Sequence, residues 1–241
     1  MLASRGMGDH PHGEGVGAWR PLIVMPRALV YKRLVVGLIF AIAGVAALGA
    51  EAATAASASA QRPDSVRNVQ TDLARLKFLP SSQVDGKLGP RTRHAITAFQ
   101  QWNGLTPDGI AGQQTLAKLR TATVPQAGNH GASRRIEIHR AKGITLLIDR
   151  GKVTRAIHSS AGSRGFETPT GAYRIERKVL RDWSRPYQAW MPYAAYFHRG
   201  YALHEGNVPA HPASHGCVRL PPGDATDVYR FATIGTAVLV S

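Results

Sequence analysis

The hydrophobic period of this 241-residue chain changes near residue 135, and that change limits the folds it can adopt. Between Pro63 and Arg120, apolar residues such as Val66, Val69 and Leu73 recur every three or four positions, as on one face of a helix. From Arg135 onward, β-branched and aliphatic residues alternate or cluster, as in partly buried strands. The sequence therefore predicts an α+β multidomain protein: a small three-helix domain followed by a mainly-β domain.

Composition divides the chain into four segments. Residues 1–60 do not resemble a folded domain, and residues 61–120 are the predicted helical domain. Residues 121–134 are rich in Pro, Gly and small polar side chains, which predicts a linker that lets the two domains reorient. The mainly-β domain occupies residues 135–241, with strands expected at 136–148, 153–159, 171–177, 189–197, 201–204 and 236–240, and a helix at 224–231.

An internal repeat lies inside the helical domain. Residues 85–92 and 108–115 share the pattern Asp-Gly-x-x-Gly-x-x-Thr, 23 residues apart. Asp-Gly favours a tight turn, so each copy predicts a turn that leads into a helix. Pro90 suits the first position of such a helix, and Asn103-Gly104 predicts its end.

The N-terminal segment has the features of an export signal. Basic residues Arg27, Lys32 and Arg33 precede an uncharged apolar run at 34–50, and Ala58-Ser59-Ala60 offers a cleavage site. We expect an exported protein of the cell wall or periplasm that begins at Gln61 after cleavage. An uncleaved membrane anchor is the alternative, because the run is only slightly shorter than the ~20 residues that span a bilayer. Translation could start at Met1, Met7 or Met25.

The chain is strongly basic, with a net charge of +15. Without residues 1–60 it keeps 25 Lys and Arg against 12 Asp and Glu, or +13. No nucleic-acid-binding motif accompanies this charge, so wall polymers carrying phosphate or carboxylate are the better match. Dispersed arginines on solvated faces are the alternative, and they need no partner.

Ser214-His215-Gly216-Cys217 contains the only cysteine in the chain. A single thiol in an exported protein cannot serve an internal disulfide, which favours a chemical role. We expect Cys217 to be a nucleophile, because His215 can take its proton and Gly216 lets backbone N–H groups face a reacting carbonyl. A packed thiol is one alternative. A zinc site of His204, His211, His215 and Cys217 is another, although it lacks the usual ligand spacing, so no metal or cofactor is expected.

Ser214 to Leu220, with Tyr201-Ala202-Leu203-His204 and Thr168-Pro169-Thr170-Gly171 upstream, resembles the catalytic domain of L,D-transpeptidases of the YkuD type. These enzymes crosslink peptidoglycan. The resemblance covers about residues 135–241. Two features depart from the family pattern: the interval from His204 to Ser214 is short, and Arg219 stands where many members have Asn.

The resemblance implies roles for residues around the cysteine. Cys217 attacks the third residue of a tetrapeptide stem, expels D-alanine and forms a thioester, which an amine of a second stem resolves. His204 is then a second catalytic histidine. The expected substrate-binding residues are Ser214, Arg219, Tyr193 and Tyr196. An L,D-carboxypeptidase or hydrolase that uses water as acceptor, and a non-catalytic wall-binding protein, are the alternatives.

The helical domain resembles the three-helix peptidoglycan-binding module found on many wall enzymes. The resemblance implies that glycan or stem peptide lies between the helices. Trp102 and Phe78, if exposed, are then candidates for stacking on sugars. Peptidoglycan is the expected partner of both domains, and the oligomeric state stays open.

Overall fold

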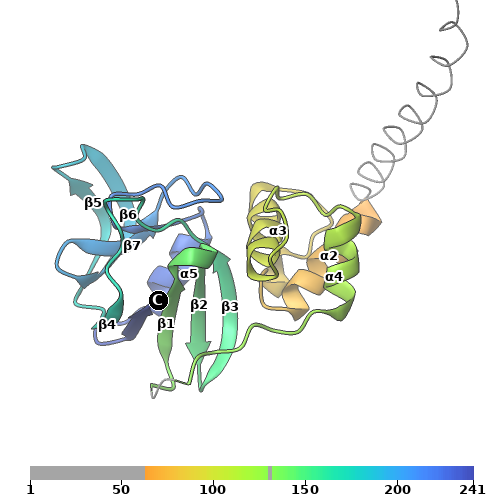
Figure 1. Cartoon of the computed structure of the whole chain (residues 1–241), viewed down its shortest axis with the longest axis horizontal. Helices are drawn as coiled ribbons and strands as arrows, with labels where there is room; N and C mark the ends of the chain where they lie inside the picture. The colour runs from red at the N-terminus through yellow and green to blue at the C-terminus, as the bar shows by residue number, and fades with distance from the viewer. Residues whose placement is uncertain (1–62, 130–131) are drawn as a thin grey trace, which may run out of the picture. The chain divides into compact units, whose positions relative to one another are not determined.

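The structure, a computed structural model, describes residues 63–129 and 132–241 (Figure 1). The predicted export signal, its cleavage site and the alternative membrane anchor lie outside the described residues. Within the described part of the chain, no helix is both long and apolar enough to cross a membrane. Residues 63–241 fall within one compact unit.

The predicted helical domain contains three α-helices. Pro90 occupies the first turn of the second helix, and the chain leaves that helix at Asn103 and Gly104, where Gly104 takes a positive φ of 69°. Both predictions are therefore confirmed. The apolar faces of the helices meet in a core that includes Leu73, Leu76 and Phe99. The helices are α2 (Pro63–Arg75), α3 (Pro90–Trp102) and α4 (Gln113–Thr121), with a 3-10 turn, η1 (Ser81–Gln83), after α2.

The two copies of the internal repeat are held by two equivalent buried glutamines. The amide nitrogen of Gln100 donates to the Asp108 carboxylate, the Ile110 carbonyl and the Thr115 hydroxyl, and its oxygen accepts from the Gly109 N–H. Gln70 makes the same set of contacts with residues 85, 86, 87 and 92. The repeat is thus turn chemistry, as predicted, and each turn is tied to the preceding helix by one amide.

The mainly-β domain contains two sheets, labelled in part in Figure 1. The first has the strand order β3-β2-β1-β9-β4, in which β1 and β9 are parallel, and the second has the order β5-β6-β7-β8, in which β7 and β8 are parallel. Both pack around a core that includes Ile136, Phe197 and Val218. The elements are β1 (Arg135–His139), η2 (Arg140–Lys142), β2 (Ile144–Asp149), β3 (Lys152–His158), β4 (Gly171–Arg174), β5 (Arg177–Ser184), β6 (Ala189–His198), β7 (Tyr201–Glu205), β8 (Val218–Leu220), α5 (Asp224–Phe231) and β9 (Ala237–Val240).

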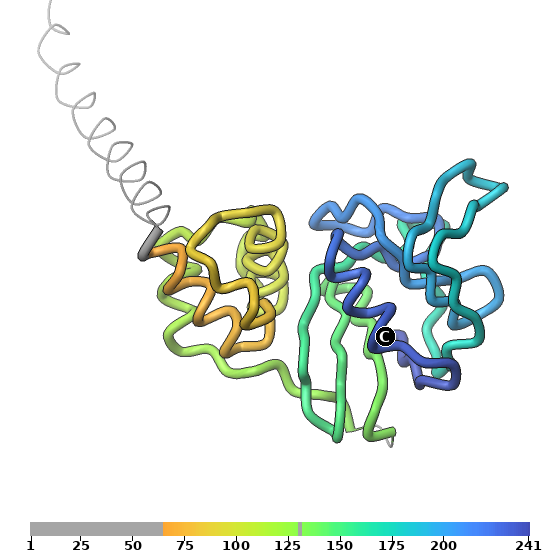
Figure 2. Tube along the Cα trace, turned by 180° about the vertical axis from the view of Figure 1, so that it is seen from behind, coloured from red at the N-terminus to blue at the C-terminus, as the bar shows by residue number. Residues whose placement is uncertain are grey.

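Two strands, β5 and β8, were not expected from the sequence. Strand β5 has no continuously buried face, so its residues lack the alternation that marks a strand. Strand β8 is only three residues long. With β6, β5 forms a hairpin that extends from the domain, seen in cyan in Figure 2. This hairpin borders the site described below.

The helical and mainly-β segments share contacts that the linker composition did not predict. One apolar core joins Leu73 and Leu76 of the helical segment to Leu146 and Ala156 of the sheet. Polar contacts add to it: Arg91 of α3 pairs with Asp224 of α5 at 3.0 Å, and the Ala156 N–H donates to the Lys77 carbonyl at 2.8 Å. These contacts oppose the expectation that the two domains reorient freely.

Candidate active site

The Cys217 loop takes a backbone conformation that only glycine adopts easily. Gly216 has φ of 115°, and a Cβ at this position would lie 2.3 Å from the Tyr201 ring. The expectation that glycine is needed between His215 and Cys217 is therefore confirmed. The loop leads directly into β8, so that Cys217 lies at the end of a buried strand.

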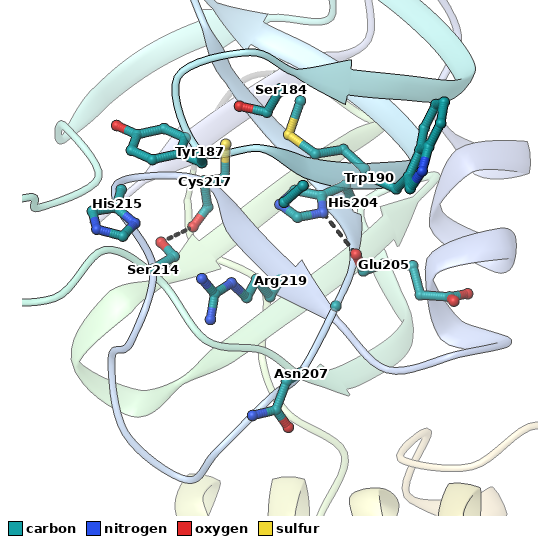
Figure 3. A pocket seen from close by; sticks show the side chains of 13 residues that line it. Ser184, Tyr187, Trp190, His204, Glu205, Asn207, Ser214, His215, Cys217 and Arg219 are labelled. Carbon is teal, nitrogen blue, oxygen red and sulfur yellow. Dashed lines mark hydrogen bonds between the residues drawn. The ribbon is translucent and has the colours of Figure 1, made fainter.

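Two buried hydroxyl groups hold this loop in place. The Ser214 hydroxyl accepts from the Gly216 N–H at 3.0 Å and donates to the Cys217 carbonyl (Figure 3). The Thr168 hydroxyl accepts from the Gly162 N–H and donates to the Gly216 carbonyl at 2.7 Å. Thr168 thus ties the Thr168-Pro169-Thr170-Gly171 segment to the Cys217 loop. Because the Gly216 N–H already has an acceptor, the Cys217 N–H is the backbone group of this loop that is left as a candidate to stabilise an oxyanion.

Cys217 lines two cavities at once. The first, here called the catalytic pocket, has a volume of about 260 Å³ and also contains His204, Ser214, His215 and Arg219. The second, here called the Tyr196 pocket, has a volume of about 500 Å³ and also contains Tyr196, Asp182 and Arg177. The thiol is therefore accessible from two cavities with different linings.

His204 has the geometry of an oriented base. Its Nδ1 lies 2.7 Å from the Glu205 carbonyl oxygen, so this nitrogen carries the proton and donates it, which leaves Nε2 as an acceptor (Figure 3). The ring is buried on β7, and β7 pairs with β8, the strand that follows Cys217. His204, on β7, and Cys217, just before β8, thus line one pocket.

Burial favours the neutral forms of both groups. It lowers the pKa of His204 below its usual value, an effect that the Glu205 carbonyl opposes and the Arg219 charge reinforces. Burial also raises the pKa of the Cys217 thiol, an effect that the Ala202 backbone and Arg219 only partly offset. Both shifts favour a thiol and a neutral imidazole over a thiolate–imidazolium pair in the resting site.

The sequence interpretation gave the proton-accepting role to His215, and the structure places this residue differently. His215 is exposed and lies between two aromatic rings, stacked on Tyr187 at 4.5 Å and edge-on to Phe166 at 4.8 Å. It lines both cavities beside Cys217. The orienting hydrogen bond expected of a base is found at His204, and the contacts of His215 are those of a pocket wall.

The expected substrate-binding residues separate into three groups. Arg219 lies in the catalytic pocket and has no carboxylate partner among the described residues, so its guanidinium is available to a ligand. Tyr196 lines the second cavity, where burial and a 2.7 Å hydrogen bond to Asp182 raise its pKa to about 12. Tyr193 packs against the core beside Tyr229, outside both cavities that contain Cys217.

Two other expectations concern metal and sugar. No three His, Cys, Asp or Glu residues among those described are grouped to hold a metal ion, so the four candidate zinc ligands do not form a cluster. Phe78 is not exposed, because its ring packs edge-on against Phe99 in the core. Trp102 is partly buried, with Lys142 over its ring and His139 at its edge. Phe78 therefore does not meet the condition for a sugar-stacking candidate, and Trp102 is largely covered.

Sequence reasoning missed the side chains that the β5–β6 hairpin brings to the site. Tyr187, Trp190 and Met191 all line the catalytic pocket, and Trp190 is 50% exposed. A signal was present, because Trp183 and Trp190 flank the turn of this hairpin and form a cross-strand pair at 5.1 Å. Because β5 was not predicted, the pairing of the two tryptophans could not be inferred from the sequence.

Comparison with known proteins finds a matching family model for each of the two segments. Residues 133–240 match the family model described as an L,D-transpeptidase catalytic domain, and residues 62–119 match a putative peptidoglycan binding domain. The crystal structure of an L,D-transpeptidase from Xylanimonas cellulosilytica is 30% identical and has a TM-score of 0.64. That match covers 73% of this chain and 92% of the other.

Two curated relatives match over short segments. An N-acetylmuramoyl-L-alanine amidase, CwlL, from Bacillus licheniformis is 44% identical over 61 residues, and an uncharacterized protein from Kitasatospora aureofaciens is 43% identical over 56 residues. The chain spans only 17% and 48% of their lengths. The likeness to the Xylanimonas structure covers nearly all of that chain, and the match to the catalytic-domain model includes Cys217, His204 and the strands that carry them. The chain belongs to the L,D-transpeptidase family.

Proposed function

We propose that this protein is a cysteine-dependent L,D-transpeptidase that crosslinks peptidoglycan stems through a thioester. The observation that carries the proposal is the pairing of Cys217 with His204 in one pocket, with His204 oriented by the Glu205 carbonyl. A nucleophile, a base and a group that orients the base are what covalent acyl transfer requires. Membership of the family supplies the reaction class.

In the first half of the reaction, the donor stem acylates Cys217. Sγ attacks the carbonyl carbon of the third stem residue, and the thiol proton moves to Nε2 of His204. As the tetrahedral intermediate collapses, the C–N bond to D-alanine breaks, and His204 returns the proton to the leaving amine. The Cys217 N–H is the candidate donor to the oxyanion, an interaction that is worth about 10²–10³ in rate in other acyl-transfer enzymes.

In the second half, an amine of a second stem resolves the thioester. The amine nitrogen forms a bond to the carbonyl carbon, the C–S bond breaks, and the amine proton passes through His204 to restore the thiol. Two cavities that meet at Cys217 support a reaction with two peptide substrates, because donor and acceptor can approach from different sides. Arg219 is available in the catalytic pocket to hold a stem carboxylate.

We also propose that the protein acts outside the cytoplasm, because its substrate is there and residues 27–60 have the pattern of an export signal. The match of residues 62–119 to a putative peptidoglycan binding domain supports the wall as the place of action. Water in place of the amine would give a carboxypeptidase from the same thioester.

The test uses purified protein and a disaccharide–tetrapeptide. We expect a crosslinked dimer and free D-alanine, and a carbapenem, a compound class that acylates this family, should add its mass to the peptide that contains Cys217. Cys217→Ala should lose both. D-alanine release without a dimer would instead indicate the carboxypeptidase, and crosslinking by Cys217→Ala would overturn the mechanism.

A further inference from the structure

A third cavity lies next to the catalytic pocket. It has a volume of about 460 Å³, within the range of small-molecule sites, and is here called the His94 groove after the residue that the helical segment contributes to its lining. Trp190, Glu205, Gly206 and Asn207 line both the groove and the catalytic pocket, so the two are adjacent. In Figure 3, Trp190 and Glu205 lie on the side of the catalytic pocket opposite to His215.

One wall of the groove comes from the helical segment. His94 lies on α3, and its Nδ1 is 3.0 Å from Nδ1 of His158 on β3, so Nε2 is the nitrogen left for another partner. Burial lowers the pKa of His94, which keeps the ring neutral. The segment that matches a peptidoglycan binding domain thus contributes a side chain to a groove adjacent to the pocket of Cys217.

The groove combines an aromatic ring, held in place by its neighbours, with polar groups. Arg181 lies over the Trp190 ring at 4.2 Å and Trp183 packs against it, so the half-exposed indole is held in place. Glu205 and Asn207 offer oxygen and amide groups beside it. Neither Lys nor Arg lines the groove in the described part of the chain, whereas Arg219 lines the catalytic pocket.

From this arrangement we infer that the His94 groove binds the glycan of the donor strand, with a sugar ring against Trp190 and its hydroxyls on Glu205, Asn207 and His94. The inference rests on the proposed function, because it takes the stem peptide to occupy the catalytic pocket. It assigns the substrate class as a stem still attached to its sugars, recognised jointly by the two segments.

The chemistry of the groove favours a sugar over more peptide. A pyranose is uncharged and has an apolar C–H face that suits an aromatic ring, while its hydroxyls suit carboxylate and amide partners. A stem peptide is acidic, and the Glu205 carboxylate would repel its carboxylates, a repulsion that Arg181 on the Trp190 ring offsets only in part. The stem is joined covalently to a sugar, so a ligand that leaves the catalytic pocket at its N-terminal end must continue into sugar.

The test compares two donors that differ only in the sugar: a free tetrapeptide and the same tetrapeptide on a disaccharide. The readout is the ratio of the two kcat/KM values, in which effects on the shared chemical step cancel. Trp190→Ala should lower the preference for the glycan-bearing donor about tenfold, which corresponds to one well-packed contact. Trp190→Phe should keep most of it, and Leu180→Ala, an exposed apolar residue of β5 that lines none of these cavities, should leave the ratio unchanged.

The contribution of the helical segment has its own matched pair of variants. His94→Ala and His158→Ala both remove the 3.0 Å contact between the rings, but only His94 lines the groove. We expect His94→Ala alone to lower the ratio. Equal effects of the two variants would show that His94 acts only through packing, and an unchanged ratio in Trp190→Ala would overturn the inference.

A binding measurement separates this inference from the proposed function. Cys217→Ala protein should bind a stem-free glycan of alternating N-acetylglucosamine and N-acetylmuramic acid, with a shift of the Trp190 indole N–H resonance in NMR spectra. That shift would support the groove even if crosslinking failed. No shift at millimolar glycan, in a protein that crosslinks normally, would overturn the groove and leave the proposed function intact.

Discussion

The Nδ1 atom of His204 lies 2.7 Å from the carbonyl oxygen of Glu205, the next residue in the chain. A backbone carbonyl cannot lose its acceptor character, so this contact fixes the tautomer of His204 more firmly than an ionisable partner would. Nε2 is left to accept a proton in the pocket that holds Cys217. Under the proposed mechanism, the same contact would let a buried histidine serve as a base without a carboxylate partner.

The two histidines should respond differently to substitution. His204→Ala should slow carbapenem acylation by about 10²–10⁴, the range for a positioned proton acceptor. His215→Ala should act mainly on KM, because His215 supports Tyr187 and Phe166 by stacking. His215→Phe separates the roles. It should restore most of the activity if His215 acts by stacking, and it should be as inactive as His215→Ala if His215 is the base.

The acid limit of activity should lie below the usual pKa of histidine, which is about 6.5. His204 must be neutral to accept the thiol proton, and its pKa is lowered by burial and by the charge of Arg219. As the pH falls, activity is therefore kept through pH 6.5 and lost at the lowered pKa. The measurement is the pH profile of acylation. Arg219→Leu should move its acid limb to higher pH, and a limb that stays in place would contradict the role of Arg219.

The sequence was sufficient for the elements with a strong local signal. The period of Val66, Val69 and Leu73 gave α2, and the glycine of the cysteine loop was recognised from chemistry alone, as its φ of 115° confirms. The β5–β6 hairpin could not be predicted in the same way, because β5 lacks a buried face. Its aromatic side chains, Trp190 among them, were therefore missed as part of the site.

The division of roles between the histidines depends on tertiary contacts that no local pattern reveals. His215 is close to Cys217 in sequence, which favoured it as the base, whereas His204 comes to line the pocket of Cys217 through the parallel pairing of β7 with β8. In the same way, the shared core between Leu73 and Ala156 was hidden by a linker whose composition indicated mobility. Proximity in sequence did not predict which residues lie together in space, because strand pairing and packing determine that.

The repeat glutamines should matter for stability although neither was singled out by the Asp-Gly pattern. Gln100→Ala removes an amide that bonds four groups of the second turn, and it leaves the N–H of the buried Gly109 without its acceptor. We expect a loss of about 3 kcal/mol in the free energy of unfolding, measured by urea titration. Gln114→Ala, at an exposed position of α4, is the control and should change it by less than about 0.5 kcal/mol.

Asp224 should be the most sensitive acid at the contact between the two segments. It is buried and accepts from Arg91 at 3.0 Å and from Arg155 at 2.7 Å. Asp224→Asn leaves two guanidinium groups short of charge in a buried site, which should cost about 3 kcal/mol of unfolding free energy. The exposed pair of Arg134 and Asp149 offers a contrast. Asp149→Asn should cost at most about 1 kcal/mol, and equal costs would show that the Asp224 network is solvated.

The raised pKa of Cys217 predicts slow reaction with simple thiol reagents. Alkylation needs the thiolate, and burial keeps the resting thiol protonated at neutral pH. Iodoacetamide should therefore modify the folded protein more slowly than the urea-unfolded chain at pH 7. A nucleophile that rests as a thiolate would instead be alkylated faster in the folded protein. A carbapenem should still acylate the folded protein and not the unfolded chain, because proton transfer to His204 accompanies attack only in the formed pocket. Faster alkylation of the folded protein would instead show a resting thiolate, and it would remove the need for His204 as a base.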